Sequence, residues 1–263
     1  CCCGRREPIV LGGAVRIAAS GGHNSSSNNN SAKANAADAA AKANHKDSKT
    51  IRIARIQLEQ DTGKSSHDDV TLPGVTLVDL NRAGAALMEI VTEPDMESGR
   101  DAAEFVATLQ TLLRTVGTCD GNMQDGSLRA DVNVSVTFPS GKSSARVEVK
   151  NLNSLRAVER AVAFEYARLV EMGEPGLGEK RPNETRGFDA KTGATTPLRT
   201  KETMGEYRFM PEPDLPALLV ADADVERLKR DMAALPDRIR ERLNAFGLLP
   251  TETEALVRNA ALL

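Results

Sequence analysis

The stretch ARVEVKNLNSLRAVERAVAFEYARLVEMG (residues 145–173) contains a strand pattern followed directly by a helix pattern. In its first part Val147 and Val149 alternate with charged residues, which is typical of a strand with one buried face. Apolar residues then recur at helical spacing, beginning after Ser154, a typical helix N-cap, and ending at Gly173. This stripe is expected to face the core, and it consists of Leu155, Val158, Val162, Tyr166 and Leu169. The stretch therefore predicts a strand over 145–150 and a helix over 155–172.

The same two patterns recur outside this stretch. In ADVNVSVT (130–137) three valines alternate with polar residues, so two neighbouring strands each present a polar face to water or to a ligand. A second amphipathic helix is expected over 101–116, after Ser98 and before Gly117. Further strands are expected over 51–58, 76–80 and 87–92, and the first of them should contain a bulge near Ala54 and Arg55. Further helices are expected over 237–247 and 251–263.

These elements predict an α+β fold, in which an antiparallel sheet carries helices on one side and a helical segment follows. Residues 20–49 are rich in Ser, Asn and Ala and are expected to form a disordered insertion, because they offer little apolar surface to bury. The expected organisation is a partial strand over 1–19, this insertion over 20–49, a sheet-containing domain over 50–221 and the start of a helical domain over 222–263.

Composition excludes several classes of protein. The formal net charge is −3 and the pI about 5.8, which argues against a stand-alone nucleic-acid binder held mainly by phosphates, and no DNA partner is expected. Three of the 4 cysteines are consecutive, so neither a disulfide framework nor a zinc site follows. No apolar run approaches membrane-spanning length, and there is no Walker loop, GxGxxG or GxSxG motif.

Two segments could hold a magnesium ion. RIQLEQDTGK (55–64) places Glu59, Gln60, Asp61 and Lys64 around a glycine turn, and carboxylates near a lysine suit a phosphate-bound Mg²⁺, although exposed acidic turns are common. Glu89 lies inside the apolar run LMEIV, where an ionised carboxylate is costly unless it is paired or bound to metal. The alternative for Glu89 is a buried salt bridge.

Two further segments could hold a nucleotide. Glu148, Lys150 and Asn151 lie close together and could face a nucleotide, whereas the plainer interpretation is that the asparagines shape a tight turn and cap the next helix. Basic residues then recur between 184 and 209, where they form either a solvated face or clamps on phosphate. The phosphate-binding candidates are Lys64, Arg186, Arg199 and Lys201.

Six blocks, in order along the chain, resemble the signature blocks of the B-subunit family of glutamyl/aspartyl-tRNA amidotransferases, the GatB/GatE family. They are LEQDTGK (58–64), VDLNRAGAALMEIVTEPD (78–95), DGNMQDGSLRADVNVSV (120–136), EVKNLNS (148–154), ETRGFD (184–189) and YRFMPEPDLP (207–216). The resemblance implies that residues 50–221 are the second half of a catalytic cradle domain related to glutamine synthetase, with residues 1–19 as a partial strand of it, and that residues 222–263 begin a helical domain. Because the family's first strand with its Glu-Val-His motif and its tail domain have no counterpart here, the chain is expected to be incomplete at both ends.

The resemblance also implies a reaction. The family is a ligase that activates the side-chain carboxylate of misacylated Glu-tRNA(Gln), or of Asp-tRNA(Asn), with ATP and Mg²⁺, and then amidates it with ammonia made from glutamine by the A subunit. The implied partners are the A subunit, the small C subunit and the tRNA, with no membrane. The alternative is a non-catalytic remnant or scaffold that only binds the A and C subunits.

Carried over by position, Glu89 falls on the family's metal-ligand glutamate, and Gln60 falls where bacterial members have a second metal-binding glutamate. An amide brings no charge, so Glu59 or Asp61 is expected to substitute for it. Gln60 together with YRFMPEPDLP resembles the mitochondrial branch, so a mitochondrial location is expected, with the chloroplast as the alternative. No targeting segment is visible in the chain.

Overall fold

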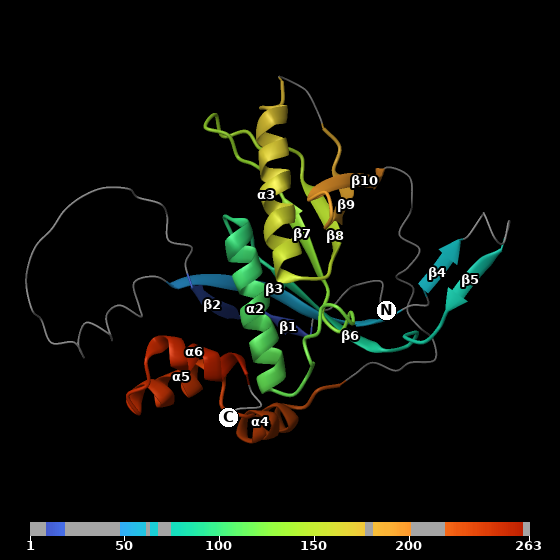
Figure 1. Cartoon of the computed structure of the whole chain (residues 1–263). Coiled ribbons are helices and arrows are strands. Elements are labelled where there is room, and N and C mark those ends of the chain that lie inside the picture. The colour runs from blue at the N-terminus through green and yellow to red at the C-terminus, as the bar shows by residue number, and fades with distance from the viewer. Residues whose placement is uncertain are drawn as a thin grey trace, which may run out of the picture. The chain divides into compact units, whose positions relative to one another are not determined.

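The computed structural model describes residues 9–18, 48–61, 64–67, 75–176, 181–200 and 219–259, with the backbone alone at 64–67, 151, 199 and 200. The chain divides into two compact units (Figure 1). The first contains the described residues within 1–14, 51–95 and 205–219, and the second contains those within 15–50, 96–204 and 220–263. The expected insertion over 20–49 lies outside the described residues up to 47, and its last two residues belong to a strand instead.

Strand β3 (Ser48–Gln60) organises the first sheet, because β1 (Val10–Leu11), β2 (Ala14–Ala18) and β6 (Ala86–Thr92) all pair with it. The expected bulge is confirmed: the antiparallel register with β6 shifts between Ile53, opposite Thr92, and Arg55, opposite Val91. One extra residue on β3 reverses which side chains face each side of the sheet. After the bulge, Arg55, Gln57 and Glu59 therefore share one face of β3, and Ile56 and Leu58 lie on the other.

A separate two-stranded hairpin in the first unit consists of β4 (Lys64–His67) and β5 (Thr76–Asp79), paired antiparallel. The residues of β5 are all exposed. The expected strand over 76–80 is thus confirmed to within one residue. The loop Asn81–Gly84 then leads into β6.

The second unit contains a four-stranded sheet in the order β10-β9-β8-β7. Its strands are β7 (Ala130–Val134), β8 (Val147–Leu152), β9 (Glu184–Asp189) and β10 (Ala194–Thr200). The expected antiparallel sheet is confirmed only in part, because β8 and β9 run parallel. A helix, α3, connects them, and a crossover through a helix returns the chain to the same end of the sheet. The fold is therefore mixed α and β, with antiparallel and mixed sheets.

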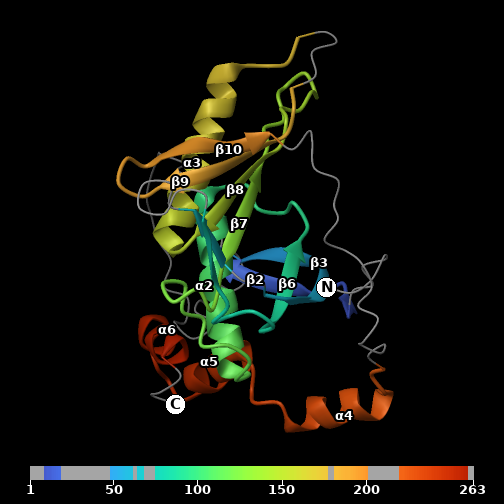
Figure 2. The same ribbon diagram turned by 90° about the vertical axis from the view of Figure 1, so that its right-hand side faces the viewer.

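Helices α2 (Gly99–Thr115) and α3 (Leu155–Met172) begin as the sequence predicts, with the Ser98 and Ser154 side chains accepting backbone N–H groups. The α3 helix ends at Gly173, also as predicted. It covers one face of the four-stranded sheet, and α2 packs against it (Figures 1 and 2). Side chains from the sheet and from α3 form the core, and they include Val147, Val149, Leu152, Val158, Ala161 and Leu169.

The buried face of α3 differs from the apolar stripe that the sequence predicts. Tyr166 was expected to lie on the core side, but its exposed fraction is 57%. The buried position one residue earlier is occupied by Glu165, which is fully buried. The helix is therefore turned so that a charged residue takes the place that apolar periodicity assigned to an aromatic one.

Three short helices complete the described chain: α4 (Asp222–Asp231), α5 (Pro236–Ala245) and α6 (Pro250–Arg258). The last two confirm the expected helices near 237–247 and 251–263, with α6 ending sooner. Within the described residues, no helix has the length and apolar character needed to cross a membrane.

Candidate functional site

A polar face of the first sheet brings together two of the predicted metal ligands. Gln57, whose exposed fraction is only 3%, lies opposite Glu89 in the β3–β6 register, and Glu59 lies two residues further along the same face. The Gln57 side-chain amide donates hydrogen bonds to Glu89 Oε2 and, over 3.1 Å, to Glu59 Oε1. Arg55 Nε donates to Gln57 Oε1 over 3.1 Å. The amide thus lies between two carboxylates, and among the described residues Glu89 has no salt bridge.

The structure does not bring the other predicted ligands to this face. Gln60 lies on the opposite face of β3, because side chains alternate along a strand, and it is exposed. Asp61 lies at the end of the strand, where its Oδ2 is 2.8 Å from the Arg82 guanidinium. Lys64 begins β4, where only its backbone is described.

The pair Glu59 and Glu89 matches the donor set that Mg²⁺ uses with phosphates. Magnesium is usually held by one or two carboxylates, with waters and substrate phosphates completing its octahedron. Within the described ranges no cluster of three or more His, Cys, Asp or Glu residues exists that could hold a metal by protein ligands alone. Two carboxylates on one sheet face fit a metal that arrives with a nucleotide better than a closed structural site.

The face of the four-stranded sheet opposite to α3 carries the second predicted cluster. Lys150 Nζ lies 3.2 Å from Glu148 Oε1 and 3.5 Å from Asp131 Oδ2. Thr185 Oγ1, on the parallel neighbour β9, donates to Glu148 Oε2 over 3.2 Å. Asn133 lies opposite Glu148 on β7. Both oxygens of Glu148 are therefore engaged, and the partly exposed Lys150 is held between two carboxylates.

Arg186 lies on the other face of this sheet, toward α3. Its Nε is 3.0 Å from Glu165 Oε1 and donates to Thr195 Oγ1 over 2.8 Å. Its Nη1 donates to Glu184 and its Nη2 donates to the Thr195 carbonyl, each over 2.9 Å. Thr195 Oγ1 also donates to Glu165, and Arg168 lies 2.9 Å from the other Glu165 oxygen. The geometry gives Arg186 a role in joining β9 and β10 to α3.

The remaining predicted nucleotide contacts are located by backbone alone or lie outside the described residues. Asn151 belongs to β8, and Arg199 lies opposite Thr185 in the β9–β10 register. Lys201 lies outside the described residues. By register, Arg199 is therefore aligned with the strand position that contacts Glu148.

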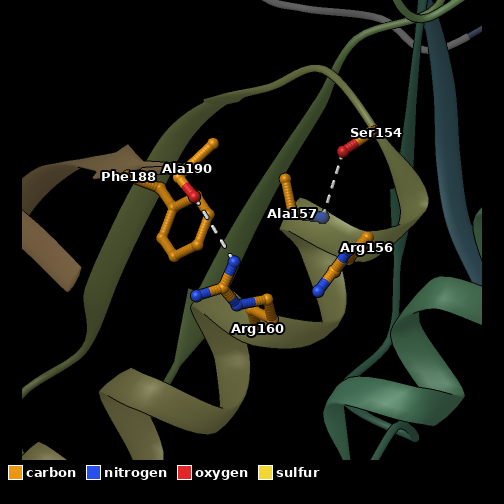
Figure 3. A pocket seen from close by; sticks show the side chains of 6 residues that line it. All are labelled: Ser154, Arg156, Ala157, Arg160, Phe188 and Ala190. Atoms are coloured by element: carbon orange, nitrogen blue, oxygen red, sulfur yellow. Dashed lines mark hydrogen bonds between the residues drawn. The ribbon is translucent and has the colours of Figure 1, made fainter. Parts of the chain in front are cut away.

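Two cavities adjoin at the start of α3, and Ser154 lines both. The first, of about 350 Å³, is lined by Arg156, Arg160, Phe188 and Ala190 (Figure 3). Arg160 NH1 donates to the Ala190 carbonyl over 3.3 Å, and its guanidinium lies 5.9 Å from the centre of the Phe188 ring. Arg160 thereby holds the β9–β10 turn against the helix.

The second cavity, of about 440 Å³, lies between the end of α2 and the loop 119–128. Arg114 donates to the Asp120 carbonyl and, over 3.3 Å, to Asn122 Oδ1, while Gln110 donates to the Gly121 carbonyl over 2.7 Å. The backbone N–H of Asn122 also bonds the Asp120 carboxylate, and this bond is the main reason why the pKa of Asp120 is lowered. These bonds order the loop that forms the cavity wall.

Sequence reasoning missed three residues of these sites. Gln57 and Thr185 are recognisable only from register, because each is placed by a partner strand far along the chain. Asp131 had a local signal, since it lies on the polar side of the valine alternation next to the strand that carries Lys150. The alternation predicts a polar face that meets water or a ligand, but it does not single out Asp131 on that face.

Comparison with known proteins gives one family and a consistent set of relatives. The model of the "GatB/GatE catalytic domain" matches residues 4–226. The B subunit of the aspartyl/glutamyl-tRNA(Asn/Gln) amidotransferase of Rickettsia bellii is 47% identical over 210 residues, 80% of this chain and 43% of the relative. The chloroplastic/mitochondrial B subunit of the glutamyl-tRNA(Gln) amidotransferase of Ostreococcus tauri is 46% identical over 258 residues, 96% of this chain and 45% of the relative. The chain thus spans less than half the length of these relatives.

Proposed function

Because the chain belongs to the GatB/GatE catalytic-domain family, we propose that it is the part of an amidotransferase B subunit that activates the carboxylate of a misacylated tRNA with ATP. The substrates are Glu-tRNA(Gln) or Asp-tRNA(Asn), the two kinds that the names of its relatives include. The activity makes the protein a component of a ligase. The sheet-containing part is proposed to be a cradle of the glutamine-synthetase type.

The proposed chemistry has two balanced steps. A carboxylate oxygen of the aminoacyl group attacks the γ-phosphorus of ATP, ADP leaves, and an acyl phosphate forms. Ammonia derived from glutamine then attacks the acyl carbon, phosphate leaves with the former carboxylate oxygen, and the amide loses a proton to solvent. The first step is needed because a carboxylate is a poor electrophile.

The observation that carries this proposal is the pairing of Glu89, at the family's metal-ligand position, with Glu59 on one sheet face. A bound magnesium ion would neutralise charge on the phosphates. Gln57 orients both carboxylates and reduces their mutual repulsion, because its amide donates to each of them. In this proposal Glu59 replaces Gln60 as the second ligand.

Within the second unit, Lys150 is proposed as a phosphate-binding cation. Lys150 is tethered by Glu148 and Asp131, and only part of its side chain is exposed, so its ammonium group is held in one region of the sheet face. A fixed ammonium group can stabilise charge on a phosphoryl oxygen without reorganising during the reaction. Glu148 and Thr185 act as positioning residues, because Glu148 holds Lys150 by an ion pair and Thr185 donates a hydrogen bond to Glu148.

The partners and the location are inferred from the names of the relatives. Each relative is named as one lettered subunit, which implies a complex of several chains. We assign the A subunit, which supplies ammonia, and the small C subunit as its partners. The Ostreococcus relative is named chloroplastic/mitochondrial, which supports an organelle. Between the two organelles, the glutamine at position 60 favours the mitochondrion.

The test is to replace Glu89 by Gln in the full-length protein, assembled in its complex. Acyl-phosphate formation on Glu-tRNA, followed as ADP release without glutamine, should fall by roughly 100-fold and should respond more weakly to Mg²⁺. Glu97→Gln serves as the matched control, because 85% of that side chain is exposed. Unchanged ADP release in the Glu89→Gln complex would contradict the metal role. A wild-type complex that assembles with its partners without any tRNA-dependent ADP release would favour the scaffold alternative.

A further inference from the structure

The pairing of β3 with β6 follows two registers, one on each side of the bulge. In the first register Ile53 lies opposite Thr92, and in the second Gln57 lies opposite Glu89. If the first register continued without the bulge, Glu89 would lie opposite Ile56. Because side chains alternate along a strand, its carboxylate would then lie on the face of the sheet away from Gln57. The proposed metal pair therefore forms only in the second register.

The end of the strand pair before the bulge is fixed in the first register. The Glu93 N–H donates to the Arg52 carbonyl over 2.9 Å, and the Arg52 N–H donates to Asp95 Oδ2 over 2.8 Å. The Arg52 guanidinium also binds the same carboxylate, with Nη2 2.6 Å from Asp95 Oδ1. These contacts alone would extend the first register along both strands, so the second register needs a cause at the other end.

The apolar side chains give the second register little support. Leu58 lies opposite Met88 after the bulge, and each of these residues is 42% exposed. A register is strongly specified where one face of the paired strands is buried, and weakly where that face meets water. A further contact is therefore needed to hold the strands in the second register.

Asp61 supplies this contact at the other end of β3. Its N–H donates over 2.8 Å to the carbonyl of Ala85, the residue that the second register places opposite to it, and its own carbonyl accepts from the Gly84 N–H over 2.9 Å. Gly84 has a φ of +82°, which glycine adopts without strain. The Asp61 carboxylate, with a side chain only 12% exposed, lies 2.8 Å from the Arg82 guanidinium. The ion pair thus ties the turn before β6 to the end of β3.

We propose that Asp61 and Arg82 are positioning residues for the metal pair: their ion pair holds β3 and β6 in the second register and so places Glu89 against Gln57. The sequence suggested Asp61 as a metal ligand, whereas its contacts give it a role that acts through Glu89. This inference rests on the proposed function, since that function gives Glu89 its metal. The register itself can be measured without any substrate.

The first experiment traps the first register in the full chain with the pair Leu58→Cys and Leu87→Cys. These positions lie on opposite faces in the second register and directly opposite each other in the first, so a disulfide between them reports the first register alone. Under mild oxidation, peptide mapping should show this disulfide forming about fivefold faster when Asp61→Asn or Arg82→Met is added, the effect of losing one ion pair. The pair Leu58→Cys and Met88→Cys, opposite in the second register, verifies that the oxidation works.

Asp95→Asn is the matched control for this measurement. It removes an ion pair of the same kind from the other end of the strand pair, where the contacts favour the first register. It should therefore not speed the disulfide between Leu58→Cys and Leu87→Cys. Equal acceleration by Asp95→Asn would mean that the disulfide reports general loosening of the strands, and this would overturn the assignment.

The second experiment measures the Mg²⁺ dependence of ADP release in the full-length protein, assembled in its complex. Asp61→Asn and Arg82→Met should each raise the Mg²⁺ concentration for half-maximal release by roughly tenfold. The double variant should be no worse than either single variant, because both changes remove one interaction. Arg82→Lys, which keeps the charge, should recover part of the loss. If Asp61 were a metal ligand, Arg82→Met would not raise the Mg²⁺ requirement, because an arginine cannot bind the ion.

Two further outcomes would overturn the assignment. The first is a disulfide between Leu58→Cys and Leu87→Cys that forms at the same rate with and without Asp61→Asn. The second is a raised Mg²⁺ requirement in Asp61→Asn but not in Arg82→Met. Disulfide formation needs neither ATP nor tRNA, so the register can be upheld while Glu89→Gln contradicts the proposed function, and the reverse is equally measurable. Unchanged thermal unfolding verifies that each variant is folded.

Discussion

The Arg186 guanidinium lies 3.0 Å from the carboxylate of Glu165, whose side chain is 0% exposed. Arg168 lies on the second oxygen of Glu165, and Glu184 accepts from both arginines. Two cations and two carboxylates thus connect α3 to β9. Charge and hydrogen bonds are balanced within the network, which is the condition under which ionised groups are tolerated in a protein interior.

The first prediction concerns this network. Glu165→Gln should lower the free energy of unfolding by about 3 kcal/mol, because it leaves two arginines facing a neutral partner in a buried place. Urea denaturation of the full chain measures the change. Glu171→Gln, an exposed site on the same helix, should change stability by less than about 0.5 kcal/mol.

The same network separates two roles for Arg186. If Arg186 is structural, Arg186→Met should destabilise the chain, and the effect should not add to that of Glu165→Gln, since the two side chains share one interaction. A variant of normal stability that had lost ATP affinity would instead support the phosphate role predicted from the sequence. The double-mutant cycle and an ATP titration together distinguish the two results.

Local patterns predicted the parts of the fold that depend on local physics. The caps at Ser98 and Ser154, the stop at Gly173 and the bulge after Ile53 each follow from a few neighbouring residues. The parallel pairing of β8 with β9 was not predictable in this way, because it depends on where α3 returns the chain. From its charge alone, Arg186 was therefore predicted to bind phosphate, because its carboxylate partner Glu165 lies on another element.

In the candidate site, too, local patterns predicted some residues and only strand pairing identifies the others. Glu89 was identifiable because a carboxylate inside an apolar run is unusual, and family position gave it a role. Gln57 was not identifiable, although it contacts Glu89, because its importance comes from cross-strand register. The proposal that Glu59 and not Gln60 is the second ligand likewise depends on which residues share a face of β3 after the bulge. In this protein the register decides which polar residues can act together.

The second prediction concerns close packing between α2 and α3. A Cβ atom at Gly99 would lie 2.3 Å from the carbonyl oxygen of Glu159, so a side chain cannot be added without separating the helices. Gly99→Ala should therefore destabilise the chain by about 2 kcal/mol, despite the better helix propensity of alanine. Arg100→Ala, at the next and exposed position, is the control and should be nearly neutral. A Gly99→Ala chain as stable as the control would show that the two helices do not meet closely at this point.

The third prediction concerns acid stability and the carboxylate of Glu254, which joins α5 and α6. Arg240 donates to both of its oxygens over 2.9 and 3.1 Å, and Arg258 donates over 2.9 Å while also reaching Glu104 of α2. Burial alone would raise the pKa of Glu254, but the bonds from the two arginines outweigh it and hold the pKa below its usual value of 4.5. Asp237 also faces Arg240, so the cations are shared with a second carboxylate.

A folded-state pKa below the unfolded value means that the ionised carboxylate stabilises the fold. This contribution is complete above pH 4.5 and is lost as the pH falls through the folded-state pKa. Glu254→Gln should therefore be less stable than wild type at neutral pH, and the two should converge in acid. Chemical denaturation at a series of pH values measures the difference. Glu241→Gln is the matched control on α5, because its partner Arg238 is 77% exposed. The free energy of unfolding of this control should follow that of wild type at every pH. A stability difference that is the same in acid as at neutral pH would mean that the charge on Glu254 does not join these helices.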